Sequence, residues 1–208
     1  MSSSDLVRLG GLAAVGAGVL YVLGDLFTVT YLFTEEPFSE TVRTIPFAVQ
    51  QVLFLLGNML LVGGLVSLYV RQSETAGILG LAGFLVALVG TVLVAGASWT
   101  QVFVAPTAAV EAPVLLDEEP TGALALGFTL TFLIFALGWL LFGAAALRAR
   151  IYPRIAAIVL MVGAAITFLP LPFTAFVFGV AVSWLGFSLS TGRDGTARRP
   201  SRAPSRRF

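Results

Sequence analysis

The chain has 208 residues, of which 58% are hydrophobic and 11% are charged, and its mean hydropathy is +0.97. In soluble domains about a quarter of all residues are charged, so this composition excludes a water-soluble globular protein. The chain contains no Cys and no His, and its 12 basic residues are all Arg. These absences exclude disulfides, thiolate nucleophiles, zinc or haem sites built on His or Cys, Schiff bases on Lys, and P-loop nucleotide hydrolysis. We therefore expect a membrane protein that is not an enzyme and that holds no cofactor and no metal.

Long apolar runs predict an all-α protein, an integral membrane bundle of six transmembrane helices. A helix needs about 20 apolar residues to cross a hydrocarbon core of about 30 Å. The first run is longer than the apolar region of a signal peptide, and no convincing cleavage site follows it, so we expect it to be retained. The predicted spans cover residues 9–31, 46–70, 77–103, 122–147, 155–169 and 172–190.

The last apolar run, residues 155–189, is the ambiguous one. As a single helix it would be roughly 52 Å long, well beyond the thickness of the core. Pro170 and Pro172 cannot continue a helix without the loss of backbone hydrogen bonds, so we expect a turn there. The first four spans follow from length alone, whereas the short fifth helix depends on these prolines.

The charges between the spans alternate in sign. Arg residues precede the first span, lie in the expected Arg-Gln-Ser-Glu turn 71–74, and follow the fourth span, whereas loops 34–44 and 105–121 are acidic. The positive-inside rule then places both termini in the cytoplasm. We expect three helical hairpins in a multi-pass transmembrane domain, residues 1–190, in the cell inner membrane.

The C-terminal segment, residues 191–208, is rich in Arg, Ser and Pro and is expected to be a disordered, basic cytoplasmic tail. Each Arg could contribute about 1 kcal/mol to the free energy of binding to anionic lipid headgroups. The alternative is that the tail only sets the topology. Nucleic-acid binding is not expected, because the tail lacks a folded scaffold and interleaved aromatic residues.

The segment from Leu140 to Ala157, LLFGAAALRARIYPRIAA, lies between the fourth and fifth predicted spans. It resembles the helix–Arg–Pro-Arg–helix junction of uncharacterised multi-pass integral membrane proteins of high-GC bacteria. The resemblance covers about a tenth of the chain. It implies a helical membrane bundle, and it implies no activity and no catalytic residues.

Small residues predict which helix faces pack together, since helices in lipid approach closely where side chains are small. In the first and third spans such residues recur at intervals of three and four, which places them on one face of each helix. We expect the first three helices to pack tightly through these faces. The expected packing residues are Gly11, Ala14, Gly18, Gly80, Gly83 and Gly90, with Gly77 on the same face as the last three.

Asp25 is the only ionisable residue within an apolar run. A carboxylate at the centre of a transmembrane helix costs roughly 2.5–3.5 kcal/mol, so it calls for an explanation. Its distance from Arg8 places it in the outer third of the membrane core, where other polar residues enter the second and third helices. The candidate polar pocket consists of Asp25, Gln50, Gln51, Asn58, Ser98 and Gln101.

Two functions remain open for this chain. One is a structural, accessory or lipid-interacting membrane protein, in which Asp25 is a packing residue hydrogen-bonded to Gln50, Gln51 or Gln101. The alternative is a small transporter or channel, coupled to a cation, a proton or an amine, with an outward-facing pocket around Asp25. Membrane lipids are the expected partners of the first, and a small cation or amine is the partner of the second. The sequence leaves oligomer formation open.

Overall fold

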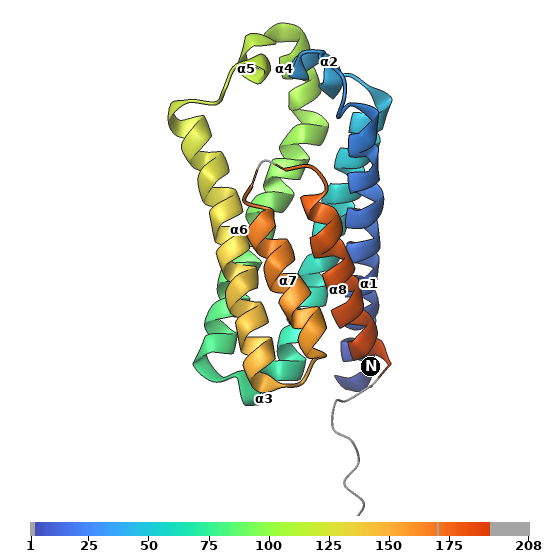
Figure 1. The fold of residues 1–208 in the computed structure, drawn as a ribbon, viewed down its shortest axis with the longest axis vertical. Coiled ribbons are helices and arrows are strands. Elements are labelled where there is room, and N and C mark those ends of the chain that lie inside the picture. Colours follow the sequence, from blue (N-terminus) through green and yellow to red (C-terminus); the bar gives the residue numbers. More distant parts are fainter. Residues whose placement is uncertain (1–2, 170, 192–208) are drawn as a thin grey trace, which may run out of the picture.

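The computed structural model describes residues 3–169 and 171–191, and within them all regular elements are helices (Figure 1). The elements in chain order are α1 (Ser3–Leu26), the 3-10 helix η1 (Phe27–Thr30), α2 (Phe38–Val42), α3 (Ile45–Phe103), α4 (Ala105–Glu111), α5 (Val114–Asp117), α6 (Gly122–Ala149), α7 (Arg154–Ile166) and α8 (Thr174–Ser190). The predicted tail from residue 192 onward and Pro170 lie outside the described residues.

The long element α3 folds back on itself at Gly77, so that residues 45–76 and 78–103 form two antiparallel limbs (Figure 1). We call them α3a and α3b. Gly77 has φ 56° and ψ −151°, which a residue without Cβ adopts at little cost. The expected turn at 71–74 is therefore wrong: these residues are helical and Gln72 is fully buried. Gly77 makes the reversal and does not belong to the packing face of the third span.

The six long segments form a closed ring in the order α1, α3a, α3b, α6, α7 and α8, and each neighbouring pair is antiparallel. Its interior is filled by large aromatic side chains of α6 and α8, since Trp139, Phe142 and Phe178 are all 0% exposed. Trp139 donates a hydrogen bond to Thr91 of α3b at 3.2 Å, which satisfies its buried indole. The core is thus shared by both halves of the chain.

The small-residue faces lie against different partners than expected. Gly11 and Gly18 of α1 contact α8, where a Cβ added at Gly18 would lie 2.2 Å from the carbonyl oxygen of Gly179. Ala14 lies against Gly64 of α3a and Gly186 of α8. Gly83 and Gly90 of α3b lie against the backbone of α6, and Gly80 lies near Ala145 of the same helix. The first three helices are therefore held together partly through α6 and α8.

Helices α1, α3 and α6 are long and apolar enough to cross a membrane. Large apolar side chains are exposed around them, among them Leu12, Leu56, Val92 and Leu133. Such surfaces are stable in lipid and not in water. The chain is therefore a membrane-associated helical bundle.

The hairpin of α7 and α8 is shorter than the rest of the ring, and its turn lies well below the end that carries α2, α4 and α5 (Figure 1). With 13 and 17 residues, the two helices are about 20 and 26 Å long. The predicted helices 155–169 and 172–190 are thus separated by a wider break, residues 167–173. Phe173 has φ 61° directly before α8.

The short helices α2, α4 and α5 close one end of the bundle, which we call the cap end (Figure 1). Asp117 accepts hydrogen bonds from the backbone N–H and the hydroxyl of Ser39, both at 2.8 Å, and so joins α5 to the start of α2. Beneath them Phe47 and Ala109 belong to a second apolar cluster. The acidic loop 105–121 is therefore an ordered part of the fold.

Candidate functional site

A cavity of about 280 Å³ lies inside the ring, above the turn between α7 and α8, and we call it the central cavity. Five of the six side chains of the predicted polar pocket line it: Asp25, Gln51, Asn58, Ser98 and Gln101. The aromatic rings of Phe132, Phe135 and Phe178 form much of the remaining wall. Residues of α1, both limbs of α3, α6, α8 and the α7–α8 turn thus meet around one space.

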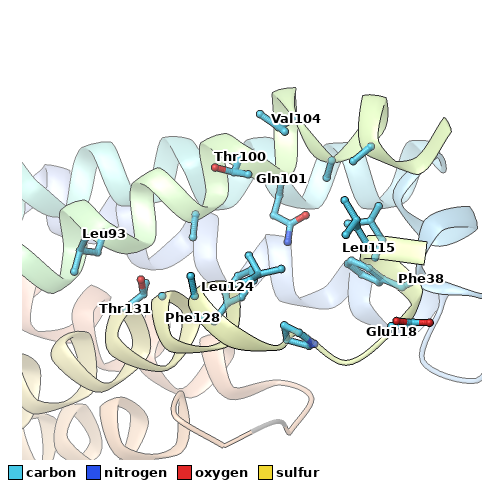
Figure 2. A pocket seen from close by; sticks show the side chains of 17 residues that line it. Phe38, Leu93, Thr100, Gln101, Val104, Leu115, Glu118, Leu124, Phe128 and Thr131 are labelled. Atoms are coloured by element: carbon cyan, nitrogen blue, oxygen red, sulfur yellow. The ribbon is translucent and has the colours of Figure 1, made fainter. Parts of the chain in front are cut away.

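A second cavity, of about 540 Å³, lies between α3b, α6 and the cap end, and we call it the lateral cavity (Figure 2). Its wall is mostly apolar, with Leu93, Leu124 and Phe128 along the two helices and Phe38 and Leu115 at the cap end. Both cavities are lined by Ala97, Gln101 and Phe128, so they adjoin at this point.

Asn58 is the centre of a hydrogen-bond network in the central cavity. Its side-chain oxygen accepts from the Tyr21 hydroxyl at 2.7 Å. Its Nδ2 donates to the Phe54 carbonyl oxygen at 2.8 Å and to Ser98 Oγ at 3.3 Å. Asn58 is 0% exposed, so these bonds satisfy an amide that would otherwise be costly to bury. The network links α1 to both limbs of α3.

Asp25 is bound to the start of α8. Its Oδ2 accepts a hydrogen bond from the backbone N–H of Phe176 at 2.7 Å, and its Oδ1 accepts one from the Thr28 hydroxyl at 3.2 Å. No side chain within α8 caps its N-terminus, so Asp25 supplies this cap from α1. The partners expected for Asp25, namely Gln50, Gln51 or Gln101, were therefore wrong.

Gln50 lies outside the central cavity and extends the Asp25 network toward the cap end. Its amide nitrogen donates to Thr28 Oγ1 at 2.9 Å, and its amide oxygen accepts from the Tyr31 hydroxyl. The hydrogen bonds thus run in series from Tyr31 through Gln50 and Thr28 to Asp25. Every group in this series has a partner of the correct kind, as in a structural network.

Gln101 differs from the other polar residues of the site. Figure 2 shows its side chain extending from α3b toward α6, into the lateral cavity. Its oxygen Oε1 is buried and has no hydrogen-bond partner in the structure. A buried acceptor without a donor costs about 1–3 kcal/mol. Gln101 therefore carries a buried amide oxygen that no donor of the described residues satisfies.

Charged groups are scarce around both cavities. Of the described lining residues, the carboxylates are Asp25, which is engaged with α8, and Glu118, which is exposed at the cap end; Arg is not among them. Within the described chain, no group of three or more His, Cys, Asp or Glu could hold a metal ion.

The lateral cavity carries no signal in the sequence. Leu93, Leu124 and Gly127 are apolar residues of apolar helices, and the same residue types face lipid elsewhere. Only the way α6 lies against α3b distinguishes the two cases. Thr167 and Thr174 also line the central cavity and were not predicted, because they flank a break whose extent depends on tertiary packing.

No known protein family, no curated protein and no solved structure matches this chain.

Proposed function

We propose that this chain is a multi-pass inner-membrane protein, not an enzyme, that binds a lipid or another long amphiphile between α3b and α6. The observation that carries the proposal is the lateral cavity of about 540 Å³, which is lined mostly by apolar side chains and adjoins the polar central cavity at Gln101. Pockets for apolar ligands commonly combine such walls with a few polar groups at one place. Membrane lipids are the ligands that reach this site without crossing water.

In the proposed topology, α1, α3a, α3b and α6 cross the membrane. The fifth and sixth predicted spans are replaced by α7 and α8, which at 13 and 17 residues form a hairpin that enters from the same side as both termini. The support is the distribution of charge. The helix ends opposite the cap end carry Arg8, Arg71, Arg148, Arg150 and Arg154, whereas the cap end carries acidic residues and Arg43, which is paired with Glu40 at 3.1 Å. By the positive-inside rule the cap end faces outward.

The alternative, a transporter or channel for a cation, a proton or an amine, has less support. Both oxygens of Asp25 accept hydrogen bonds from the protein. A cation at this carboxylate would have to compete with these contacts.

The test of the proposed lipid site uses two matched glycines. Gly127 lines the lateral cavity, and a Cβ built there meets no atom within 4 Å, so Gly127→Leu would fill the cavity without a backbone clash. Gly96 on α3b has equally open surroundings and lines neither cavity, so Gly96→Leu is the control.

We expect the protein purified in nanodiscs to retain lipid, and Gly127→Leu to lower the amount several-fold while Gly96→Leu leaves it unchanged. Native mass spectrometry after release from the nanodisc measures the bound lipid. Equal retention by all three proteins would contradict the lateral cavity as a lipid site.

A further inference from the structure

We infer that the turn between α6 and α7 binds the head group of an anionic phospholipid. Three of the seven residues from 148 to 154 are arginines, namely Arg148, Arg150 and Arg154, and we call this segment the Arg junction. It lies at the end of the bundle opposite the cap end, and its residues line neither of the two cavities (Figure 1). The inference therefore goes beyond the proposed lipid site between α3b and α6 and does not depend on it.

The charges of the Arg junction are exposed and unpaired. All three side chains are exposed, and in the part of the chain that the structure describes no ion pair or side-chain hydrogen bond engages them. The described acidic residues at the same end are Asp5 in α1 and Glu74 in α3a. A lipid phosphate is the anion that a membrane surface presents to this turn, and Arg binds phosphate oxygens through a planar fork of N–H donors.

The backbone of the Arg junction holds these side chains in a defined place. The N–H of Arg150 donates to the Ala146 carbonyl oxygen at 3.1 Å and ends α6, and the Tyr152 hydroxyl ties the turn to Leu68 of α3a at 2.8 Å. Arg150 has φ 56° and ψ 27°, the left-handed conformation in which Gly is the favoured residue at the end of a helix. The chain thus carries an Arg where Gly would strain the backbone less.

An apolar face continues from the Arg junction along α7. Ile158 and Val162 follow Arg154 at intervals of four residues, so the three side chains lie on one side of the helix. Both are 50% exposed, and Ile155 beside them is 63% exposed. In a membrane these side chains contact the acyl chains of a lipid whose head group lies at the level of Arg154. A basic cluster beside an apolar face suits an anionic phospholipid better than a soluble anion.

The experiment compares two probes that have the same acyl chains. Dioleoylphosphatidylglycerol is anionic, and dioleoylphosphatidylcholine is zwitterionic. The full chain is prepared in nanodiscs that contain both lipids in equal amounts, and native mass spectrometry gives the ratio of the two among the lipids that remain bound. A further arm adds inorganic phosphate in excess, which tests whether the Arg junction takes a free anion instead of a lipid.

The variants separate a binding site from a diffuse attraction between Arg and negative charge. Arg150→Gly removes one guanidinium and relieves the left-handed conformation, so it should weaken lipid binding while it makes the fold more stable. Arg8→Gln is the matched control, because Arg8 is exposed at the same end of the bundle but lies on α1, outside the Arg junction. Gly127→Leu, which fills the lateral cavity, should leave the ratio of the two probes unchanged.

We expect the wild type to retain the anionic probe about tenfold over the zwitterionic one, with or without phosphate. Arg150→Gly should lower this ratio about fivefold, the effect of one Arg near a membrane surface, and should raise the thermal unfolding midpoint. Arg8→Gln should leave the ratio as it is. The comparison of the two probes on the wild type does not depend on any variant being stable.

Equal retention of the two probes by the wild type would overturn the inference, whatever the variants do. An equal fall of the ratio in Arg150→Gly and Arg8→Gln would also overturn it, because the attraction would then be diffuse. Displacement of the anionic probe by inorganic phosphate would assign the Arg junction to a free anion and not to a lipid. None of these results would bear on the lateral cavity.

Discussion

At the scale of single residues, most buried polar side chains of the described chain are hydrogen-bonded, whereas Gln72 and Gln101 keep buried amide atoms without a partner. Asp25 joins α1 to α8 through its bond to Phe176, and Asn58 joins the two limbs of α3 through its bond to Ser98. A carboxylate within an apolar helix is usually taken as a functional residue. Here its geometry is that of a helix cap.

Asp25→Ala should destabilise the protein by about 1–2 kcal/mol, because the N-terminus of α8 loses its cap. Asp25→Asn should cost less, since an amide oxygen still accepts from Phe176. Thermal unfolding in detergent measures both. The carrier alternative would replace the structural role if the wild-type protein took up a cation or an amine into liposomes and Asp25→Asn, equally stable, did not.

Tyr152 lies between α6 and α7, and its hydroxyl donates to the Leu68 carbonyl oxygen of α3a at 2.8 Å. Burial raises the pKa of this phenol above its ordinary value, and nearby Arg71 partly opposes the shift. A raised pKa stabilises the fold fully below pH about 10, where the unfolded phenol is also neutral, and this contribution is lost as pH rises further.

We therefore expect Tyr152→Phe to cost about 1 kcal/mol at neutral pH and to flatten the loss of stability above pH 10. The measurement is the unfolding midpoint as a function of pH. An alkaline slope that is the same in Tyr152→Phe and wild type would show that this phenol does not contribute.

At the scale of the elements, close helix contacts position α8 and thereby the floor of the central cavity. Gly18 and Gly179 lie directly opposite each other, and the hydroxyl of Ser183 donates to the Val15 carbonyl oxygen at 3.2 Å beside them. In lipid, such close approach replaces the hydrophobic effect as the source of helix association. A side chain at either glycine would separate α1 from α8.

Gly18→Ala should destabilise the protein by about 1–3 kcal/mol, because the new methyl group would meet the backbone of α8, which cannot rotate away. Gly63→Ala is the matched control: a Cβ at Gly63 meets nothing within 4 Å, so helix propensity should make it neutral or slightly stabilising. Urea or thermal unfolding in the same detergent compares them. A Gly18→Ala protein as stable as Gly63→Ala would contradict this contact.

At the scale of the whole molecule, the ring is uneven, since the α7–α8 hairpin ends partway along the other helices (Figure 1). The central cavity occupies the interior above its turn, and the lateral cavity adjoins it toward the cap end. A full-length pair of helices in this position would reduce that space. The short hairpin therefore leaves the space of the central cavity unfilled.

The absence of native Cys allows the topology to be mapped with single cysteines. With an impermeant maleimide on intact cells, we expect Glu119→Cys at the cap end to be labelled and Ser73→Cys to be labelled only after permeabilisation. Leu171→Cys, in the α7–α8 turn, should react much more slowly than Glu119→Cys. Labelling of Ser73→Cys in intact cells would reverse the orientation, and fast labelling of Leu171→Cys would mean that the hairpin crosses completely.

Much of the fold could be predicted because membrane helices are dictated by local composition. Each long apolar run must satisfy its backbone hydrogen bonds within itself, so the helices follow from length alone. The break near Pro172 follows from the missing N–H of proline. The sequence places the reversal at residues 71–74 and not at Gly77. The polar residues 71–74 are compatible both with a turn and with a helix that continues to the next glycine.

The candidate site could be predicted only in part. Spacing along a helix indicates which residues share a face, and five of the six expected polar residues do line one cavity. It does not indicate which helix covers that face, so the partner of Asp25 was missed: Phe176 is far away in the chain and contributes only a backbone N–H. The sequence does not indicate which backbone N–H groups are available as donors to a distant side chain.

By itself, the sequence determined that the protein is membrane-associated and helical, and it determined the sign of the charge at each end of the bundle. These properties depend on composition and on local hydrogen bonding. Only the tertiary structure decided which glycine faces meet, that Asp25 caps α8, and that Gln101 has an acceptor without a donor beside an apolar cavity. Those properties arise from contacts between helices distant in sequence, where a displacement of one helix by a few ångströms opens or closes a cavity.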